Sequence, residues 1–232
     1  MRRAVADGHR VIGCARRTDR LAALAAELGE AVLPWTLDVT DAAAVAALPD
    51  ALPAAWRAID VLVNNAGLAL GLDPAASAKV TDWDTMVAVN VTGLLHVTRA
   101  ILPGMVARDD GLIVNLGSVA ATYPYPGGHV YGASKAFVAQ FSLNLKADLI
   151  GTGVRVTNIE PGLVSGSEFS TVRFGDPARA AKVYEGTVPL TAEDIAGTVA
   201  WLLALPAHVN INRIEMMPTC QASQALAIKR AT

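Results

Sequence analysis

Short apolar segments alternate with segments of helical periodicity along most of the chain. The apolar segments predict strands over residues 10–15, 31–37, 59–63, 112–116, 154–159 and 209–216. Helical periodicity lies between them, over residues 19–28, 41–52, 81–102, 130–149 and 191–203. Apolar strands that alternate with helices predict a parallel sheet covered on both faces. Because crossovers in such a sheet are right-handed, we expect a doubly wound, Rossmann-type α/β fold.

Local signals mark the ends of several of these helices. Thr40 is expected to cap the second helix and Thr81 the third. Pro103 is expected to end or kink the third helix. Thr191 and Asp194, three residues apart, predict the start of the last helix.

The chain has no linker, repeat or low-complexity stretch, so we expect residues 1–232 to form a single domain. Hydrophobic residues make up 53% of the sequence, which is enough for a sizeable core. Residues 162–190 form the longest segment without clear periodicity. A loop of that length in a compact domain is usually functional.

Charge and composition narrow the possible partners. The net charge is −2, which gives no sign of nucleic acid or an anionic membrane as a partner. The longest apolar runs, such as 200–205, are too short to span a bilayer, so we expect no membrane association. No continuous apolar segment or small-residue cleavage site follows the basic residues at 1–3, so we do not expect a signal peptide there. Cys14 and Cys220 lack metal-ligand spacing, and we expect reduced thiols in a cytoplasmic protein.

Candidate chemistry centres on Ser118, Tyr131 and Lys135. Residues four apart share one face of a helix, so Tyr131 and Lys135 are expected to lie together. A free tyrosine has a pKa near ~10, and an ammonium one turn away is expected to lower it. Ser118 could hold a carbonyl oxygen against the phenol. The spacing alone is equally compatible with a packing tyrosine beside an exposed lysine.

Further motifs surround these three residues. Asp38-Val39, Asn64-Asn65-Ala66-Gly67 and Asn90 precede them, and Pro161-Gly162 follows. Over nearly the whole chain this order resembles the short-chain dehydrogenase/reductase family. Within it, the chain is most similar to the NADP-dependent 3-hydroxy acid dehydrogenases, which act on serine-like and malonic-semialdehyde-like substrates. The stretches that carry this closer resemblance are 63–71, 102–106, 159–164, 168–170, 172–174 and 205–212.

The resemblance implies a dinucleotide-binding oxidoreductase that transfers a hydride between NADP(H) and a small hydroxy or oxo substrate. Tyr131 would exchange the hydroxyl proton, and Lys135 would lower the Tyr131 pKa and bind the nicotinamide ribose. Ser118 would steady the substrate oxygen, and Asn90 would order a water of the proton relay. Asn90 could instead be an ordinary polar residue of its helix.

Arg16 and Arg17 follow the strand at 10–15, where the resemblance places the adenosine ribose. An acidic residue there would accept a hydrogen bond from the 2′-hydroxyl of NAD. Two guanidinium groups instead suit the 2′-phosphate of NADP, because arginine binds phosphate through a planar fork. We therefore expect NADP as the cofactor. The alternative is a pair of solvated surface arginines.

The resemblance assigns further cofactor contacts to other strand ends. Asp38 would bond the adenine edge and Val39 would supply its backbone N–H, although Asp38 could instead cap a helix. Asn64, Ala66 and Gly67 end a strand at the sheet edge where ligands bind, and small residues there let the backbone approach the cofactor. As a bare tetrapeptide the motif could also be a simple turn.

The resemblance assigns Pro161-Gly162 and Val164 to the nicotinamide end of the cofactor. It also identifies 162–190 as the lid over the substrate. Arg173 lies in this lid and could bind a substrate carboxylate bidentately. An exposed lid arginine without such a role is an equal alternative.

The family begins with a strand and a Gly-rich turn that holds the cofactor diphosphate at a helix N-terminus. Neither this strand nor the Gly-rich turn precedes the strand at 10–15, and the pattern of residues 2–7 predicts the end of the first helix. Roughly 15–20 residues are therefore expected upstream. We expect the missing strand to lie between 10–15 and 59–63, so both neighbours would lose a ladder partner.

Other functions remain open from the sequence. Without the diphosphate loop, the chain could be a catalytically inactive paralogue that serves as a binding or oligomerisation partner. An epimerase or dehydratase of the same fold would need a different catalytic layout, which the complete Asn, Ser, Tyr and Lys set argues against. The expected partners are a small-molecule substrate and, by family habit, further copies of the chain in a homotetramer.

Overall fold

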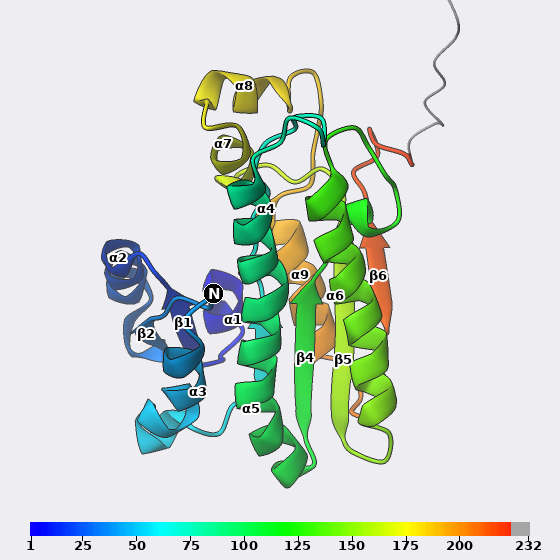
Figure 1. The fold of residues 1–232 in the computed structure, drawn as a ribbon. Helices are drawn as coiled ribbons and strands as arrows, with labels where there is room; N and C mark the ends of the chain where they lie inside the picture. The colour runs from blue at the N-terminus through cyan, green and yellow to red at the C-terminus, as the bar shows by residue number, and fades with distance from the viewer. Residues whose placement is uncertain (224–232) are drawn as a thin grey trace, which may run out of the picture.

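The computed structural model describes residues 1–223 and shows parallel strands with helices on both sides (Figure 1). The doubly wound, Rossmann-type fold predicted from the sequence is confirmed. The strands of this part are β1 (Val11–Ala15), β2 (Val32–Thr36), β3 (Val61–Asn64), β4 (Gly111–Leu116), β5 (Val154–Pro161) and β6 (Arg213–Met216).

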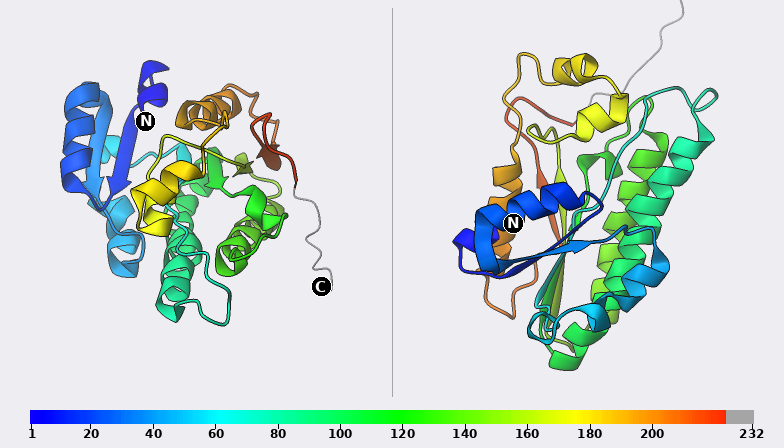
Figure 2. Two further views of the ribbon diagram at one scale, coloured as in Figure 1. Left: turned by 90° about the horizontal axis from the view of Figure 1, so that it is seen from above. Right: turned by 90° about the vertical axis from the view of Figure 1, so that its left-hand side faces the viewer.

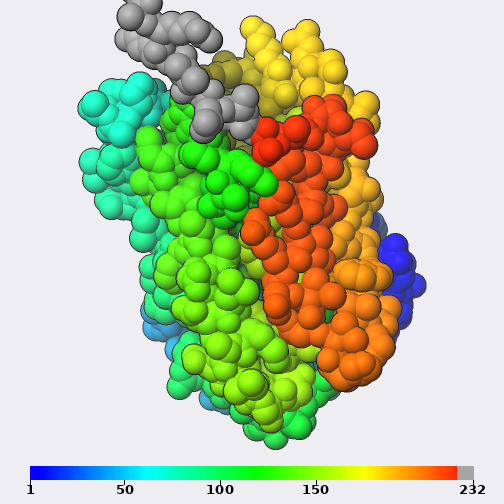
Figure 3. Space-filling view, turned by 90° about the vertical axis from the view of Figure 1, so that its right-hand side faces the viewer, coloured from blue at the N-terminus to red at the C-terminus, as the bar shows by residue number. Residues whose placement is uncertain are grey.

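Strand pairing divides the sheet into two parts. β1 pairs with β2, and the other strands pair in the order β3-β4-β5-β6, all in parallel. Within residues 1–223, β1 and β3 do not pair with each other, in agreement with the expectation that they are not neighbours. β6 is the outer strand, and its segment lies beside α6 on the face seen in Figure 3.

Helices cover both faces of the four-stranded part. α4, α5 and α6 lie on one face and α9 lies on the other (Figures 1 and 2). The helices are α1 (Arg2–Ala6), α2 (Thr18–Leu28), α3 (Ala42–Ala51), α4 (Val80–Val87), α5 (Leu94–Arg108), α6 (His129–Asp148), α7 (Phe169–Phe174), α8 (Pro177–Lys182) and α9 (Ala192–Leu203). Short helical segments are η1 (Gly29–Ala31), η2 (Ala54–Trp56), η3 (Ala88–Gly93) and η4 (Val119–Ala121).

The apolar run of β4 is explained by burial on both faces. Leu112 and Val114 pack in one cluster with Leu202 of α9. Ile113 points to the opposite side and packs in the cluster of α3, α5 and α6 that includes Met105. Successive strand residues alternate between faces, so a strand covered on both sides is apolar throughout.

Two predicted helix caps are wrong. Asp41, not Thr40, caps α3, because its carboxylate accepts hydrogen bonds from two backbone N–H groups of the first turn. The third helix begins at Val80, so Thr81 lies inside it and caps nothing. Pro103, expected to end or kink its helix, does not end it, since α5 continues to Arg108 and packing of its buried side chains outweighs the lost hydrogen bond. The predicted capping box of Thr191 with Asp194 is confirmed.

The continuous helical run Val80–Arg108 is longer than the uninterrupted apolar runs of the sequence. It is 29 residues long, with a mean hydropathy of 1.4 in an 18-residue window of which 33% is buried. By length and composition such a helix could cross a membrane, but core helices of globular domains have the same length and composition. Here Leu94, Ile101 and Met105 are buried.

Candidate active site

Tyr131 and Lys135 lie on one face of α6, as their spacing predicts, and both side chains are buried. Ser118 comes two residues after the end of β4 and caps η4, which packs against α6. Its buried hydroxyl accepts a hydrogen bond from Ala120 N at 3.1 Å. The structure therefore brings the three residues together at the carboxyl edge of the sheet, where ligands bind in doubly wound folds.

The environment of Tyr131 contradicts one prediction. Burial raises the pKa of Tyr131 to about 12, while a hydrogen bond with Ser118 and the charge of Arg173 act in the opposite direction. Lys135 Nζ stands 5.9 Å from the centroid of the Tyr131 ring and does not lower this pKa. The predicted lowering by Lys135 is therefore wrong for this structure, because desolvation of the phenolate is the larger effect.

Lys135 is placed to bind a sugar hydroxyl. Burial lowers its pKa to about 8, and Nζ donates a hydrogen bond to Leu116 O at 2.7 Å. An ammonium has three N–H donors, so this bond leaves donors for a ligand. A Cβ at Gly67 would come within 3.3 Å of this nitrogen and 3.4 Å of Asn90 Oδ1. The absence of a side chain at Gly67 thus leaves room beside Lys135 Nζ and Asn90 Oδ1, and this donor set is chemically compatible with a ribose hydroxyl.

Asn90 lies in η3, a π-helical segment between α4 and α5. Its Oδ1 accepts from Leu68 N at 2.9 Å, and its Nδ2 donates to Leu68 O at 2.8 Å and to Ser134 Oγ at 3.0 Å. The buried side chain therefore clamps the loop after β3 to α6, and it is not an ordinary surface residue. Single π turns inside α-helices occur frequently at functional sites. That Asn90 orders a water of the proton relay remains a prediction.

Asn64 turns its side chain into the protein instead of towards the sheet edge. Its Nδ2 donates to Thr98 Oγ1 at 3.0 Å and to Asn115 Oδ1 at 2.8 Å. These bonds tie the ends of β3 and β4 to α5, so only the Asn64 backbone is available to a cofactor. Ala66 and Gly67 are exposed at the edge, as the prediction requires.

Arg16 and Arg17 follow β1 as expected, but each approaches a different acid. Arg16 Nη1 lies 3.8 Å from Asp38 Oδ2, and Arg17 Nη1 lies 2.6 Å from Glu168 Oε2. Both arginine side chains are exposed, so their remaining donors are open to a phosphate. The contact of Glu168 with Arg17 could not be predicted from the sequence, because the two residues are far apart in the chain.

Asp38 and Val39 form a turn after β2. Asp38 Oδ1 accepts from the Thr40 backbone N at 2.9 Å and from its hydroxyl at 2.7 Å, and these bonds hold the Asp38 pKa below its usual range. Asp41 caps the helix, so the capping alternative for Asp38 is wrong. Val39 packs against Gly93, where a Cβ would stand 2.7 Å from Val39 Cγ2.

Pro161 and Gly162 lie at the end of β5, and the predicted lid begins there. Val164 forms an isolated parallel bridge with Leu190, which brings the two ends of residues 162–190 together. This segment contains the short helices α7 and α8 above the sheet edge, although its sequence shows no clear periodicity (Figure 1). Gln221, which the sequence did not single out, accepts from the lid's backbone at its start.

Arg173 of α7 stands over the candidate catalytic tyrosine. Its Cζ lies 5.7 Å from the centroid of the Tyr131 ring, and its guanidinium donates to Gly71 O at 3.2 Å and to Tyr125 Oη at 2.9 Å. Arg173 is half-buried, so the alternative of an exposed lid arginine is wrong. Phe169, to which the sequence analysis gave no site role, packs on Tyr131 with centroids 5.6 Å apart.

A buried charged network supports the turn that carries Ser118. The Glu160 carboxylate accepts from Arg213 Nε at 2.7 Å and from Asn158 Nδ2 at 2.6 Å. Burial raises the pKa of Glu160, and the Arg213 charge opposes that rise. A Cβ at Gly117 would stand 2.5 Å from Asn158 Oδ1, so this network lies directly under the turn.

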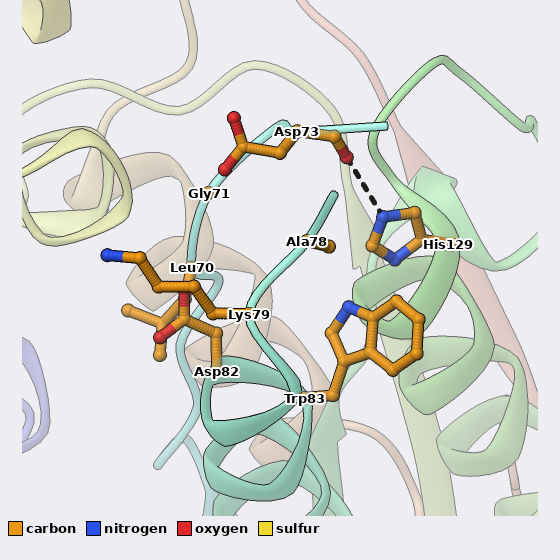
Figure 4. A pocket seen from close by; sticks show the side chains of 8 residues that line it. All are labelled: Leu70, Gly71, Asp73, Ala78, Lys79, Asp82, Trp83 and His129. Carbon is orange, nitrogen blue, oxygen red and sulfur yellow. Dashed lines mark hydrogen bonds between the residues drawn. The ribbon is translucent and has the colours of Figure 1, made fainter. Parts of the chain in front are cut away.

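A small cavity beside the lid is too small for a substrate. It has a volume of about 10 Å³ and is lined in part by Asp73, Lys79, Trp83 and His129 (Figure 4). His129 Nε2 lies 3.1 Å from the Asp73 carbonyl oxygen, and the rings of Trp83 and His129 meet edge to face at 5.1 Å. The space suits one water at most.

Comparisons with known proteins agree with this geometry. The model of the short chain dehydrogenase family matches residues 1–175. The NADP-dependent 3-hydroxy acid dehydrogenase YdfG of Salmonella typhi is 59% identical over 231 residues, which cover 99% of this chain and 93% of the relative. The serine 3-dehydrogenase of Agrobacterium fabrum is 50% identical over 230 residues, which cover 99% of this chain and 92% of the relative.

Among solved structures, the closed form of serine dehydrogenase complexed with NADP+ superposes with a TM-score of 0.98 at 55% identity, covering 99% of this chain and 93% of that one. The structure of serine dehydrogenase from Escherichia coli gives a TM-score of 0.85 at 52% identity, covering 95% and 92%. The chain belongs to the short-chain dehydrogenase family and is an NADP-dependent oxidoreductase.

Proposed function

We propose that this oxidoreductase acts on 3-hydroxy acids such as serine, allo-threonine or 3-hydroxypropionate, and on the corresponding oxo acids in the reverse direction. The names of its relatives support this substrate class. Assembly as a homotetramer in the cytoplasm is part of the same proposal and rests on the family resemblance.

The position of Arg173 over Tyr131 carries the proposal. A 3-hydroxy acid has an anionic carboxylate a short distance from its hydroxyl. Arg173 binds that carboxylate, since a guanidinium presents paired donors that match its two oxygens. The 3-hydroxyl then lies over the phenol of Tyr131. A substrate without the carboxylate would lose this anchor.

The catalytic roles follow from the geometry of the site. In the reduction direction, the neutral phenol of Tyr131, which its raised pKa favours, donates its proton to the substrate oxygen. In oxidation, the phenolate form of Tyr131 takes the proton of the substrate hydroxyl. Ser118 holds the same oxygen by a hydrogen bond. Lys135 binds the nicotinamide ribose, while Asn90 holds the loop after β3 against α6. NADP(H), when bound, supplies or accepts the hydride, and the protein contributes orientation and the proton path.

The first experiment is a fluorescence titration of the purified protein with NADPH and NADH. Saturable binding that is tighter for NADPH is expected, because Arg16 and Arg17 are available to the 2′-phosphate. If NADPH does not bind, the proposal fails, and a role as a binding or oligomerisation partner takes its place.

The second experiment compares oxidation of 3-hydroxypropionate with that of 1,3-propanediol, which lacks the carboxylate. Loss of a hydrogen bond to a charged group costs ~1.5–3 kcal/mol, so Arg173→Gln should raise KM for the acid roughly 10- to 100-fold. KM for the diol should change little. Arg179→Gln is the matched control, because this lid arginine stands over Phe174 instead of Tyr131. Equal effects on acid and diol would reject the 3-hydroxy acid assignment.

A further inference from the structure

A single carboxylate joins the lid to the opposite side of the cofactor site. Glu168, directly before α7, accepts from Arg20 Nη1 at 2.8 Å and from Arg20 Nη2 at 3.0 Å. The same carboxylate lies 2.6 Å from Arg17 Nη1. Glu168 and Arg20 are 148 residues apart in the chain. We call Glu168, Arg17 and Arg20 the lid clasp.

The rest of α7 contacts the catalytic residues. Phe169 packs on the Tyr131 ring, and Arg173 bonds Gly71 O while it stands over the same ring. Seen from above, the yellow lid helices lie between the blue β1–α2 part and the green catalytic part (Figure 2, left). α7 thus bridges the adenosine side and the substrate side of the site.

The position of α7 depends on these contacts at its two ends. It has six residues, and helices that short are unstable on their own in water. A change in the lid clasp is therefore transmitted to Phe169 and Arg173, which are the first and fifth residues of the helix.

The lid clasp also affects the choice between NADP and NAD. This step of the inference rests on the proposed function. Arg17 meets Glu168 through Nη1, and a guanidinium has five N–H donors. The other donors of Arg17 face solvent with those of Arg16, so Arg17 can hold a phosphate and Glu168 together. Arg20 neutralises Glu168 by its two-point contact, which reduces repulsion between the carboxylate and a nearby phosphate.

We propose that Glu168 and Arg20 are positioning residues that hold the lid closed, and that Arg17 couples this closure to the 2′-phosphate of NADP. A 2′-phosphate orders the Arg17 side chain in the orientation that also binds Glu168. NADPH therefore favours the closed lid more than NADH does. Cofactor preference arises in part from the lid and not only from direct contacts.

The test is hydrogen–deuterium exchange of the lid peptides over residues 163–183, measured on the cofactor-free protein and at equal occupancy by NADPH or NADH. Exposed ion pairs are individually weak, so Glu168→Gln should raise lid exchange in the cofactor-free protein by roughly two- to tenfold. NADPH should slow lid exchange of the unmodified protein more than NADH does, and Glu168→Gln should remove that difference.

Two controls distinguish loss of the lid clasp from a general destabilisation of the protein. Glu27→Gln breaks an exposed two-point pair between α2 and Arg2 that includes no lid residue, so it should leave lid exchange unchanged. The charge swap Arg20→Glu with Glu168→Arg should restore slow lid exchange relative to Arg20→Glu alone. A structural role without pairing would not produce this recovery.

Three results would overturn the proposal. The first is unchanged lid exchange in Glu168→Gln, and the second is an equal increase in Glu27→Gln. The third is that NADPH and NADH slow lid exchange equally, or that NADPH does not bind. Either outcome rejects the coupling through Arg17. Exchange in the cofactor-free protein requires no turnover, so the clasp itself can stand even where the proposed substrate class fails.

Discussion

The buried amine of Lys135 should destabilise the folded protein, and its removal should make the fold more stable. The Lys135 side chain is 6% exposed, and burial lowers its pKa from 10.5 to about 8. Lys135→Met keeps an unbranched side chain of similar length and removes the charge. The variant should therefore unfold at higher urea concentration at pH 7, although it should bind NADPH more weakly.

The size of the effect follows from proton linkage. Each pKa unit corresponds to about 1.4 kcal/mol, so the lowered pKa represents about 3 kcal/mol of unfavourable burial. The lost hydrogen bond to Leu116 O offsets about 1 kcal/mol of this gain. The net increase in the free energy of unfolding at pH 7 is therefore about 2 kcal/mol.

The sign of the pH dependence is determined by the direction of the pKa change. The unfolded chain, with a lysine pKa of 10.5, binds more protons than the folded chain between pH 8 and pH 10.5. Stability of the unmodified protein therefore rises with pH across this window. The advantage of Lys135→Met should be full below pH 8 and should disappear as the pH approaches 10.5.

The assay is urea unfolding followed by tryptophan fluorescence between pH 7 and pH 10. Lys146→Met is the matched control, because Lys146 lies on the same helix, is only half-buried and also donates to a backbone carbonyl, Val154 O at 3.1 Å. It should show no stabilisation. A Lys135→Met variant that is less stable at pH 7, or whose difference from the unmodified protein is constant with pH, would refute the reasoning.

Three further outcomes are expected. Tyr131→Phe should lower turnover by about 10²–10⁴-fold while NADPH still binds in the fluorescence titration, and near-normal turnover would contradict the proton-transfer role. Replacing Arg16 and Arg17 by Gln should weaken NADPH binding and leave NADH binding little changed; equal losses would show that they do not read the 2′-phosphate. Arg213→Met should lower the free energy of unfolding by at least about 1–3 kcal/mol, since Glu160 is left buried without its cation. Adding Glu160→Gln should recover part of that loss in the same urea unfolding assay, and no recovery would argue against the pairing.

Much of the fold could be read from local patterns. The apolar run of β4 and the helical face of Tyr131 and Lys135 are both set by the repeat of the backbone, which is two residues in a strand and 3.6 in a helix. These repeats act over a few residues, so the sequence alone shows them. The capping box at Thr191 was predictable for the same reason.

Features that depend on packing could not be read in this way. α5 runs through Pro103 because its buried residues hold it against the sheet, although proline locally disfavours a helix. α7 and α8 are too short to show periodicity and are stabilised by contacts with distant segments. Asn64 belongs to a recognisable motif, yet its side chain turns inward because Thr98 and Asn115 provide partners there.

The sequence by itself predicted the order of the strands and of the longer helices, the doubly wound fold and NADP as the cofactor, and it supplied the hypothesis for the catalytic residues. Only the tertiary structure decided the pKa values and the partners of these groups. Burial raises the pKa of Tyr131 and lowers that of Lys135, and desolvation depends on which segments pack around a side chain. Glu168 meets Arg17 because folding brings together segments far apart in the chain, and no local pattern encodes that distance.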